Sequence, residues 1–245
     1  MPQTTVPETP VDSGAEDTAN LHARIEAAKQ ASSLPHYLAI EGPVGVGKTT
    51  LARKLADVLN YPLMLEPVTE NPFLDRFYTE GASQALPTQL FFLLQRARQV
   101  VDMPGNDLLD HLLIADFMIE KDNLFARLTL DNEELELYQQ IYKSLKIEPP
   151  KPDLVIYLQA PAQVLQQRVF GRGLDFESSI DIDYLDALAD GYTEFFHYYD
   201  QAPVLIVNAA EIDFANNHHH FNALLEQILK MEGTRHFFNP NPTLL

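Results

Sequence analysis

The sequence predicts an α/β fold in which a five-stranded parallel sheet is covered by helices on both faces. Three observations predict it: five short apolar runs, helical patterns between them, and a glycine-rich turn that joins the first run to a helix. Runs that are apolar along their whole length are typical of parallel strands buried on both faces. These runs occupy residues 37–40, 63–66, 112–115, 154–158 and 204–207.

The helices follow from apolar spacing and from start signals. The helix after the glycine-rich turn has Leu51, Leu55 and Leu59 at helical spacing. Asn71-Pro72 opens the next helix, because asparagine suits the cap and proline the first turn. Further helices are expected at residues 21–31, 87–101, 118–128, 131–147, 161–171, 181–200 and 219–231.

One domain with a tail at each end is the expected organisation. The 245 residues suffice for one large core, and a single glycine-rich strand–helix unit near the start favours one domain over two. Residues 1–34 are expected to form a disordered acidic tail with a short helix, because their first part lacks apolar periodicity. The domain itself is assigned to residues 35–232, and residues 233–245 to a C-terminal tail.

The chain is strongly acidic, with 17 Lys and Arg against 35 Asp and Glu and a net charge of -18. Repulsion between like charges makes nucleic acid and anionic membranes poor partners. Neither a signal-peptide pattern nor an apolar run of membrane-spanning length occurs. The absence of cysteine excludes disulfides and agrees with a reducing compartment. We therefore expect a cytoplasmic protein.

The glycine-rich turn has the composition of a phosphate-binding loop. Its glycines let successive backbone N–H groups point into one concavity, to which the following helix adds its N-terminal dipole. Lys48 would reach the outer phosphates, and the Thr49 hydroxyl can ligate magnesium. The protein is therefore expected to bind ATP or GTP with a divalent cation. The nucleotide-binding set is Gly42, Pro43, Val44, Gly45, Val46, Gly47, Lys48, Thr49 and Thr50.

Glu66 ends the second apolar run, because Pro67 stops the strand directly after it. Ligands of open α/β sheets lie beyond the carboxyl ends of the strands, so this carboxylate is expected near the outer phosphate. A carboxylate there repels an acceptor that carries phosphate but can take a proton from an attacking hydroxyl. The expected acceptor is an alcohol.

The residues around and after Glu66 carry a family resemblance. Residues 65–68 (Leu-Glu-Pro-Val), 71–74 (Asn-Pro-Phe-Leu) and Phe77-Tyr78 resemble the deoxynucleoside kinase family, and the resemblance spans residues 36–214. It implies a P-loop kinase fold with a lid, a homodimer, and transfer of the γ-phosphoryl group of ATP to the 5′-hydroxyl of a deoxynucleoside. A purine deoxynucleoside is favoured.

The resemblance also implies roles for substrate-binding residues. Glu66 falls on the general base for the 5′-hydroxyl, while Tyr78 and the lid residue Glu177 fall on the pair that holds the 3′-hydroxyl. Gln89 matches the glutamine that pairs with the base edge, and Arg96 an arginine that assists there. The expected substrate-binding set is Glu66, Tyr78, Gln89, Phe92, Arg96, Lys121, Asp122 and Glu177.

A lid and an adenine loop complete the resemblance. Arg168 and Arg172 match arginines that clamp the transferring phosphoryl group, and their spacing of four places both on one helix face. Asp213 and Phe214 resemble a loop that closes over the adenine of ATP. The expected catalytic residues are Glu66, Lys48, Arg168 and Arg172.

The chain departs from the family after the third strand, where relatives carry an acidic residue followed by Arg and Ser. Here Asp116 can still help to bind magnesium together with Thr49, but Phe117 cannot stabilise charge on the phosphoryl group. We expect Lys121, about one helical turn beyond Asp116, to compensate by reaching Glu66 or the phosphates. Two alternatives stay open: a nucleoside monophosphate kinase, and an inactive nucleotide-binding adaptor.

Overall fold

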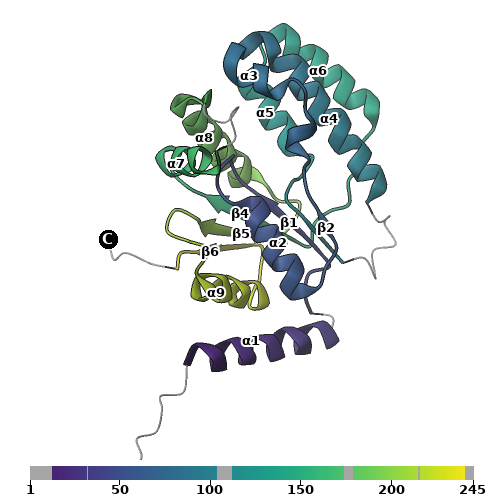
Figure 1. The fold of residues 1–245 in the computed structure, drawn as a ribbon. Helices are drawn as coiled ribbons and strands as arrows, with labels where there is room; N and C mark the ends of the chain where they lie inside the picture. The colour runs from purple at the N-terminus through teal and green to yellow at the C-terminus, as the bar shows by residue number, and fades with distance from the viewer. Residues whose placement is uncertain (1–12, 32, 104–111, 174–178, 215, 241–245) are drawn as a thin grey trace, which may run out of the picture.

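The protein is described by a computed structural model over residues 13–31, 33–103, 112–173, 179–214 and 216–240. Within these residues, six strands form one parallel sheet in the order β2-β3-β1-β4-β5-β6 (Figure 1). The α/β class with a parallel sheet is therefore confirmed. The strands are β1 (Tyr37–Glu41), β2 (Leu63–Met64), β3 (Leu113–Ala115), β4 (Leu154–Gln159), β5 (Val204–Asn208) and β6 (Arg235–Phe238).

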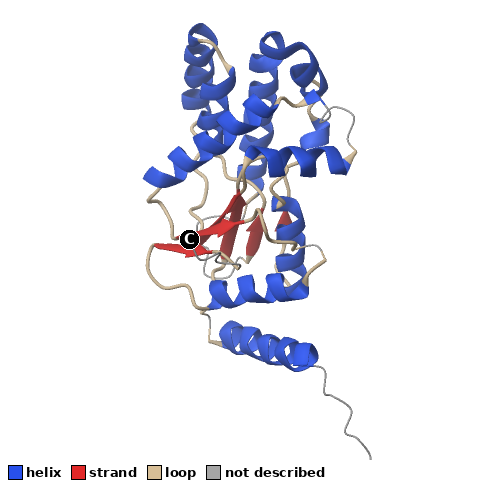
Figure 2. Ribbon diagram, turned by 90° about the vertical axis from the view of Figure 1, so that its left-hand side faces the viewer, coloured by secondary structure: helices blue, strands red, loops and turns tan. Residues whose placement is uncertain are grey.

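Helices enclose this sheet, and Figure 2 shows the strands in the middle with helices above and below them. Four helices, α3 to α6, gather beyond one end of the strands (Figure 1). None of the described helices combines the length and the apolarity that a membrane span needs. The helices are α1 (Ser13–Gln30), α2 (Lys48–Leu59), α3 (Leu74–Glu80), α4 (Ala85–Asp102), α5 (Lys121–Thr129), α6 (Asn132–Leu145), α7 (Ala162–Arg172), α8 (Ile182–Tyr198) and α9 (His218–Leu229), with 3₁₀ turns η1 (Val68–Glu70) and η2 (Gly81–Gln84).

The central strand β1 is buried at all five positions, and Leu38 pairs with Ile114 on one side and Leu154 on the other. Successive residues of a strand point to opposite faces. Leu38 and Ile40 accordingly join a core with α1, α2, α7 and α9, whereas Tyr37 and Ala39 join a core with α8. Burial on both faces explains why the strand sequences are continuously apolar.

The sheet has one strand more than the five expected from the sequence. The extra strand, β6, comes from the segment expected to be a C-terminal tail, and it pairs with β5 from Val204 and Arg235 to Val207 and Phe238. Its Phe237 is 76% exposed, because an edge strand is covered on fewer sides than a central one. Arg-His-Phe-Phe therefore lacks the continuous apolar run by which the other strands were predicted.

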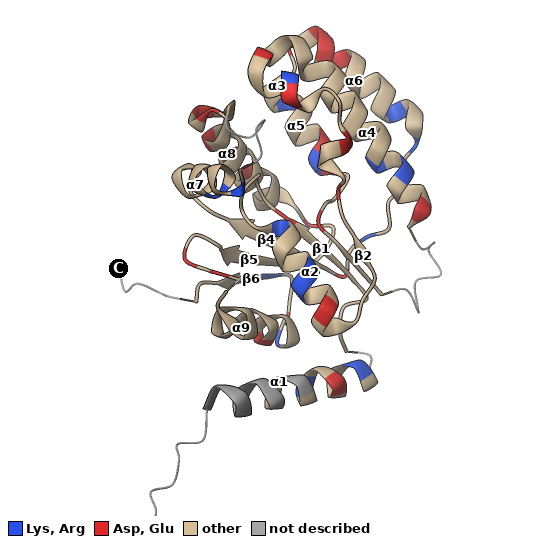
Figure 3. Ribbon diagram, viewed as in Figure 1, with Lys and Arg blue, Asp and Glu red and all other residues tan. Residues whose placement is uncertain are grey.

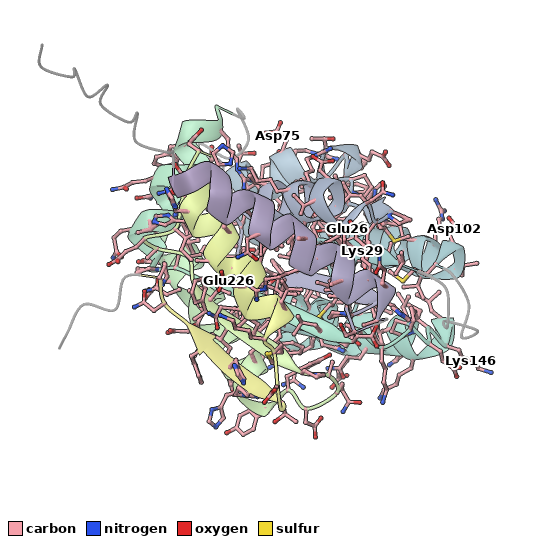
Figure 4. The ribbon with its side chains drawn as sticks, turned by 90° about the horizontal axis from the view of Figure 1, so that it is seen from below. Glu26, Lys29, Asp75, Asp102, Lys146 and Glu226 are labelled. Carbon is pink, nitrogen blue, oxygen red and sulfur yellow. The ribbon has the colours of Figure 1, made fainter. Side chains whose placement is uncertain are left out.

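The leading helix α1 begins at Ser13, whereas the sequence placed its start near residue 21. It packs against α9, and Figure 4, in which the molecule is seen from below, shows α1 lying across α9. Leu21 and Ile25 of α1 are buried in the core, and Arg24 pairs with Glu226 of α9 at 3.4 Å. This packing lies in the part of α1 that the sequence predicted, and it attaches the leading helix to the domain.

Candidate active site

The carboxyl ends of β1, β2 and β3 bring the glycine-rich turn, Glu66 and Asp116 to one edge of the sheet. A cavity of about 460 Å³ opens there, lined by residues of the turn and of α3, α4, α5 and α8. Figure 3 shows Lys and Arg residues on α2 and α7 beside this edge. Of the residues expected to function, the cavity is lined by Val44, Gly45, Lys48, Thr49, Thr50, Glu66, Tyr78, Phe92, Arg96, Asp116, Lys121 and Arg172.

The glycine-rich turn requires glycine for two physical reasons. Gly45 and Gly47 have φ angles of 83° and 109°, in the left-handed region where side chains are strained. A Cβ at Gly45 would also lie 2.8 Å from the carbonyl oxygen of Leu165 on α7. The turn therefore packs closely against α7 and presents Lys48 as the first residue of α2.

The side chain of Lys48 folds back onto the glycine-rich turn that precedes it. Its Nζ donates to the carbonyl oxygens of Gly42 at 2.7 Å and Pro43 at 3.1 Å. Burial, followed by the positive charge of Lys121, lowers the pKa of Lys48 to about 8. The two main-chain carbonyls are neutral acceptors, so a phosphate oxygen would be the stronger partner for this ammonium group.

Glu66 is held between two cations. Arg96 Nε donates to Oε1 at 2.6 Å, and Lys121 Nζ donates to Oε2 at 2.9 Å. The Glu66 side chain is 9% exposed, and burial alone would raise its pKa. The charges of Arg96 and Lys121 outweigh burial and lower the pKa of Glu66 to about 2. The carboxylate is therefore ionised at every physiological pH.

Asp116 connects Glu66 with the glycine-rich turn. Its Oδ1 accepts the backbone N–H of Glu66 at 2.7 Å, and its Oδ2 accepts the hydroxyl of Thr49 at 2.6 Å. Asp116 is buried, yet it lines the cavity beside Lys48. Carboxylate and hydroxyl oxygens are the hard ligands that magnesium prefers. The two residues therefore have the chemistry of a magnesium site.

Arg96 links Glu66 to a second buried carboxylate, that of Asp122. Arg96 Nη1 pairs with Asp122 Oδ1, and both side chains are almost fully buried. The other oxygen of Asp122 has no hydrogen-bond partner among the residues that the structure describes. The guanidinium group also stacks over Phe92, 5.0 Å from the centre of the ring. Gln89, on the same helix, is buried but does not line the cavity.

A neighbouring cavity of about 410 Å³ is also lined by the glycine-rich turn, and Arg172 lines both cavities. Asp213 and Phe214 line this second cavity, although Phe214 is buried in the core. Arg168 also lines it, but its guanidinium group donates to the carbonyl oxygens of Ala209 at 2.7 Å and Val46 at 3.2 Å. The guanidinium group of Arg168 is therefore bonded to the main chain.

The sequence of the chain matches a known protein family over most of its length. The family model described as deoxynucleoside kinase matches residues 38–231. The chain belongs to the deoxynucleoside kinase family. Membership makes the protein a deoxynucleoside kinase, a phosphotransferase, and this family assignment argues against both the monophosphate kinase and the inactive adaptor.

Relatives and solved structures agree with this assignment. A deoxyguanosine kinase of Bacillus subtilis is 35% identical over 205 residues, which cover 80% of this chain and 97% of the relative. A deoxyadenosine kinase of Dictyostelium discoideum is 29% identical over 184 residues, covering 71% and 73%. The structure of a deoxyadenosine kinase from M. mycoides with bound dATP superposes with a TM-score of 0.68 at 26% identity, covering 79% of this chain and 98% of that one.

The sequence located most of the residues that line the kinase's cavity, but it missed Tyr192 in the lining and the partner of Tyr192, Glu41. Glu41 is fully buried at the end of β1 and accepts the backbone N–H of Met118 at 2.6 Å and the hydroxyl of Tyr192 at 2.9 Å. It also lies 3.8 Å from Lys121 Nζ. Its position gave a signal, because Glu41 ends its strand as Glu66 ends the second apolar run. Glu177, by contrast, lies outside the described residues.

Proposed function

We propose that the kinase transfers the γ-phosphoryl group of ATP to the 5′-hydroxyl of a purine deoxynucleoside. The observation that carries the proposal is the Glu66 carboxylate, which shares one cavity with Lys48 and Thr49 of the phosphate-binding turn. A fixed anion beside the phosphate site disfavours an acceptor that already carries phosphate. It suits a neutral alcohol.

Glu66 orients the acceptor hydroxyl and receives its proton. With a pKa of about 2 it is a weak base for a free alcohol. Phosphoryl transfer passes through a loose transition state, in which the attacking oxygen becomes acidic only as its bond to phosphorus forms. The proton therefore moves late, and the first task of Glu66 is to aim the hydroxyl at the phosphorus atom.

Lys48, Arg168 and Arg172 are assigned to the charge on the phosphoryl oxygens. Lys48 exchanges two main-chain carbonyls for phosphate oxygens, and Arg172 lines both cavities. Asp213 and Phe214 would contact the adenine from the neighbouring cavity. Thr49 and Asp116 would hold magnesium, which when bound neutralises phosphate charge.

Lys121 replaces the arginine that the family carries after the third strand. Phe117, at that arginine's position, is fully buried and apolar, whereas Lys121 Nζ lies 2.9 Å from Glu66. The lysine keeps Glu66 ionised and brings a positive charge to the cavity. This contact supports an active kinase with an altered sequence at the end of β3.

Base recognition is assigned to Gln89, Phe92, Arg96 and Asp122, with Tyr78 and Glu177 at the sugar 3′-hydroxyl. Asp122 is fully buried outside the cavity lining, and its second oxygen has no partner in the described part of the chain, so a donor from the base edge would satisfy it. The preference for a purine is supported by the Bacillus subtilis relative, a deoxyguanosine kinase. A homodimer is proposed from the family resemblance.

A substrate panel tests the function. The kinase is incubated with ATP, magnesium and each of the four common deoxynucleosides, and the products are separated by ion-exchange chromatography. A 5′-monophosphate formed fastest from a purine deoxynucleoside is the expected result. Fastest turnover of a pyrimidine would overturn the purine preference alone, whereas phosphorylation of a monophosphate would overturn the choice of acceptor.

A further inference from the structure

Glu66 lies on a segment without regular secondary structure. Strand β2 ends at Met64 and η1 begins at Val68, so residues 65–67 have no strand partner. Buried backbone groups nevertheless need hydrogen bonds. The N–H of Glu66 donates to Asp116, and its carbonyl oxygen accepts the N–H of Val68 at 2.9 Å. The carbonyl oxygen of Pro67 accepts the N–H of Glu70 at 3.1 Å, whereas the carbonyl oxygen of Leu65 needs a donor from a side chain.

Two glutamines of α4 donate to the carbonyl groups on either side of Glu66. Gln99 Nε2 donates to the carbonyl oxygen of Leu65 at 2.9 Å, and Gln95 Nε2 donates to that of Pro67 at 3.4 Å and to Glu70 at 3.3 Å. Residues four apart lie on one helix face. That face also carries Arg96, which binds the Glu66 carboxylate. One helix surface thus holds the side chain of Glu66 and the main chain on both sides of it.

Each of the two glutamines, Gln95 and Gln99, also has a buried amide oxygen, Oε1, without a hydrogen-bond partner in the described part of the chain. An unpaired buried oxygen opposes folding, so each amide group is retained at a cost in stability. A methionine has a similar length and lacks this oxygen. Replacing glutamine with methionine therefore removes the contact with the Glu66 segment while changing stability little.

We propose that Gln99, assisted by Gln95, is a positioning residue that fixes the main chain of Glu66 so that its carboxylate faces the acceptor hydroxyl. The inference rests on the proposed function, because it assigns Glu66 to that hydroxyl. Displacing a catalytic group by about 1 Å lowers turnover strongly even when binding persists. Gln99 acts through Glu66 and touches no substrate.

The test is a double-mutant cycle in the full-length kinase. Gln99→Met is expected to lower kcat about tenfold and Gln95→Met, with its longer contacts, about threefold, while KM for ATP stays within about twofold. In a Glu66→Gln background, Gln99→Met should lower kcat by less than about twofold, because the aligned group is already gone. Gln140→Met, at an exposed position of α6, is the matched control and should leave kcat unchanged.

The outcomes separate the inference from the function on which it rests. Equal losses from Gln99→Met in both backgrounds would show a structural role and overturn the inference, as would full activity of the single variant. If Gln99→Met does not fold, the same cycle with Gln95→Met decides. A parent without nucleoside-dependent transfer would overturn the proposed function itself, and the parent assay alone shows that.

Discussion

Two ends of the site are organised differently: the proposed acceptor end (Glu66, Arg96, Lys121 and Asp122) and the proposed phosphate end (residues 42–49 with Arg168 and Arg172). At the acceptor end, buried cations pair with buried carboxylates. At the phosphate end, Lys48 and Arg168 bond main-chain carbonyls. Ion pairs of opposite charge fix a geometry more firmly than bonds to neutral carbonyls do. We infer that the nucleoside meets a preset arrangement, whereas ATP draws its cations away from the main chain.

The largest expected effect comes from Glu66→Gln at the acceptor end. The amide keeps the shape of the side chain but cannot receive the proton, so kcat should fall about a hundredfold or more. Binding of an ATP analogue, measured by calorimetry, should persist because the phosphate end is untouched. Glu80→Gln, exposed at the end of α3, is the control. Unchanged turnover would exclude Glu66 as the base.

Lys121→Met removes one of the two cations on Glu66, and turnover should fall about thirtyfold. Glu66 keeps Arg96, and Glu41 keeps Tyr192 and the N–H of Met118, so the variant should stay folded. Steady-state kinetics and thermal unfolding together measure both effects. Lys146→Met, at an exposed position, should change neither. If Lys121→Met retains full activity, Lys121 does not compensate for the missing arginine.

Gln89→Ala tests how far the acceptor end extends toward the base. Lost hydrogen bonds to the base edge should raise KM for the deoxynucleoside about tenfold, with KM for ATP within about twofold. Gln89 is buried beside the cavity and not in its lining, so the prediction also requires that the side chain reaches the bound base. Equal rises in both KM values would instead show that Gln89 supports the fold.

The smallest expected effect belongs to Tyr192→Phe, which tests whether the two ends are coupled. The Tyr192 hydroxyl donates to Glu41, and Glu41 contacts both the N–H of Gly42 and Lys121. Loss of one hydrogen bond to a charged group should cost about 1–3 kcal/mol, visible as a lower Tm. Both KM values should stay within about twofold. A large rise in both would mean that Glu41 couples the ends.

The strands that are buried on both faces were predicted with accurate bounds from the sequence. Of the two edge strands, one was missed and the other is shorter than expected. β1, β4 and β5 are continuous apolar runs, and their bounds agree with the structure within one residue. β6 was missed because an edge strand needs fewer apolar residues. The second run was expected over residues 63–66, but β2 ends at Met64, because the carboxylate of Asp116 takes the N–H of Glu66.

The candidate site could be predicted where a local pattern encodes it. The glycine spacing and the residues around Glu66 are contiguous in sequence, so both were located from the sequence alone. Contacts between distant segments, such as Tyr192 with Glu41 or Gln99 with the main chain at Leu65, leave no such pattern. They arise only when the fold brings α8 against β1 and α4 against the segment after β2.

The pairing of charges at the acceptor end bears on the release of product. Arg96 and Lys121 are already paired with Glu66 and Asp122, so a newly phosphorylated nucleoside finds little uncompensated positive charge there. Its phosphate group would lie close to the Glu66 carboxylate, which occupies both cations and leaves the phosphate no ion pair at this end. The same carboxylate that aligns the incoming alcohol would therefore help to expel the finished monophosphate and begin the next turnover.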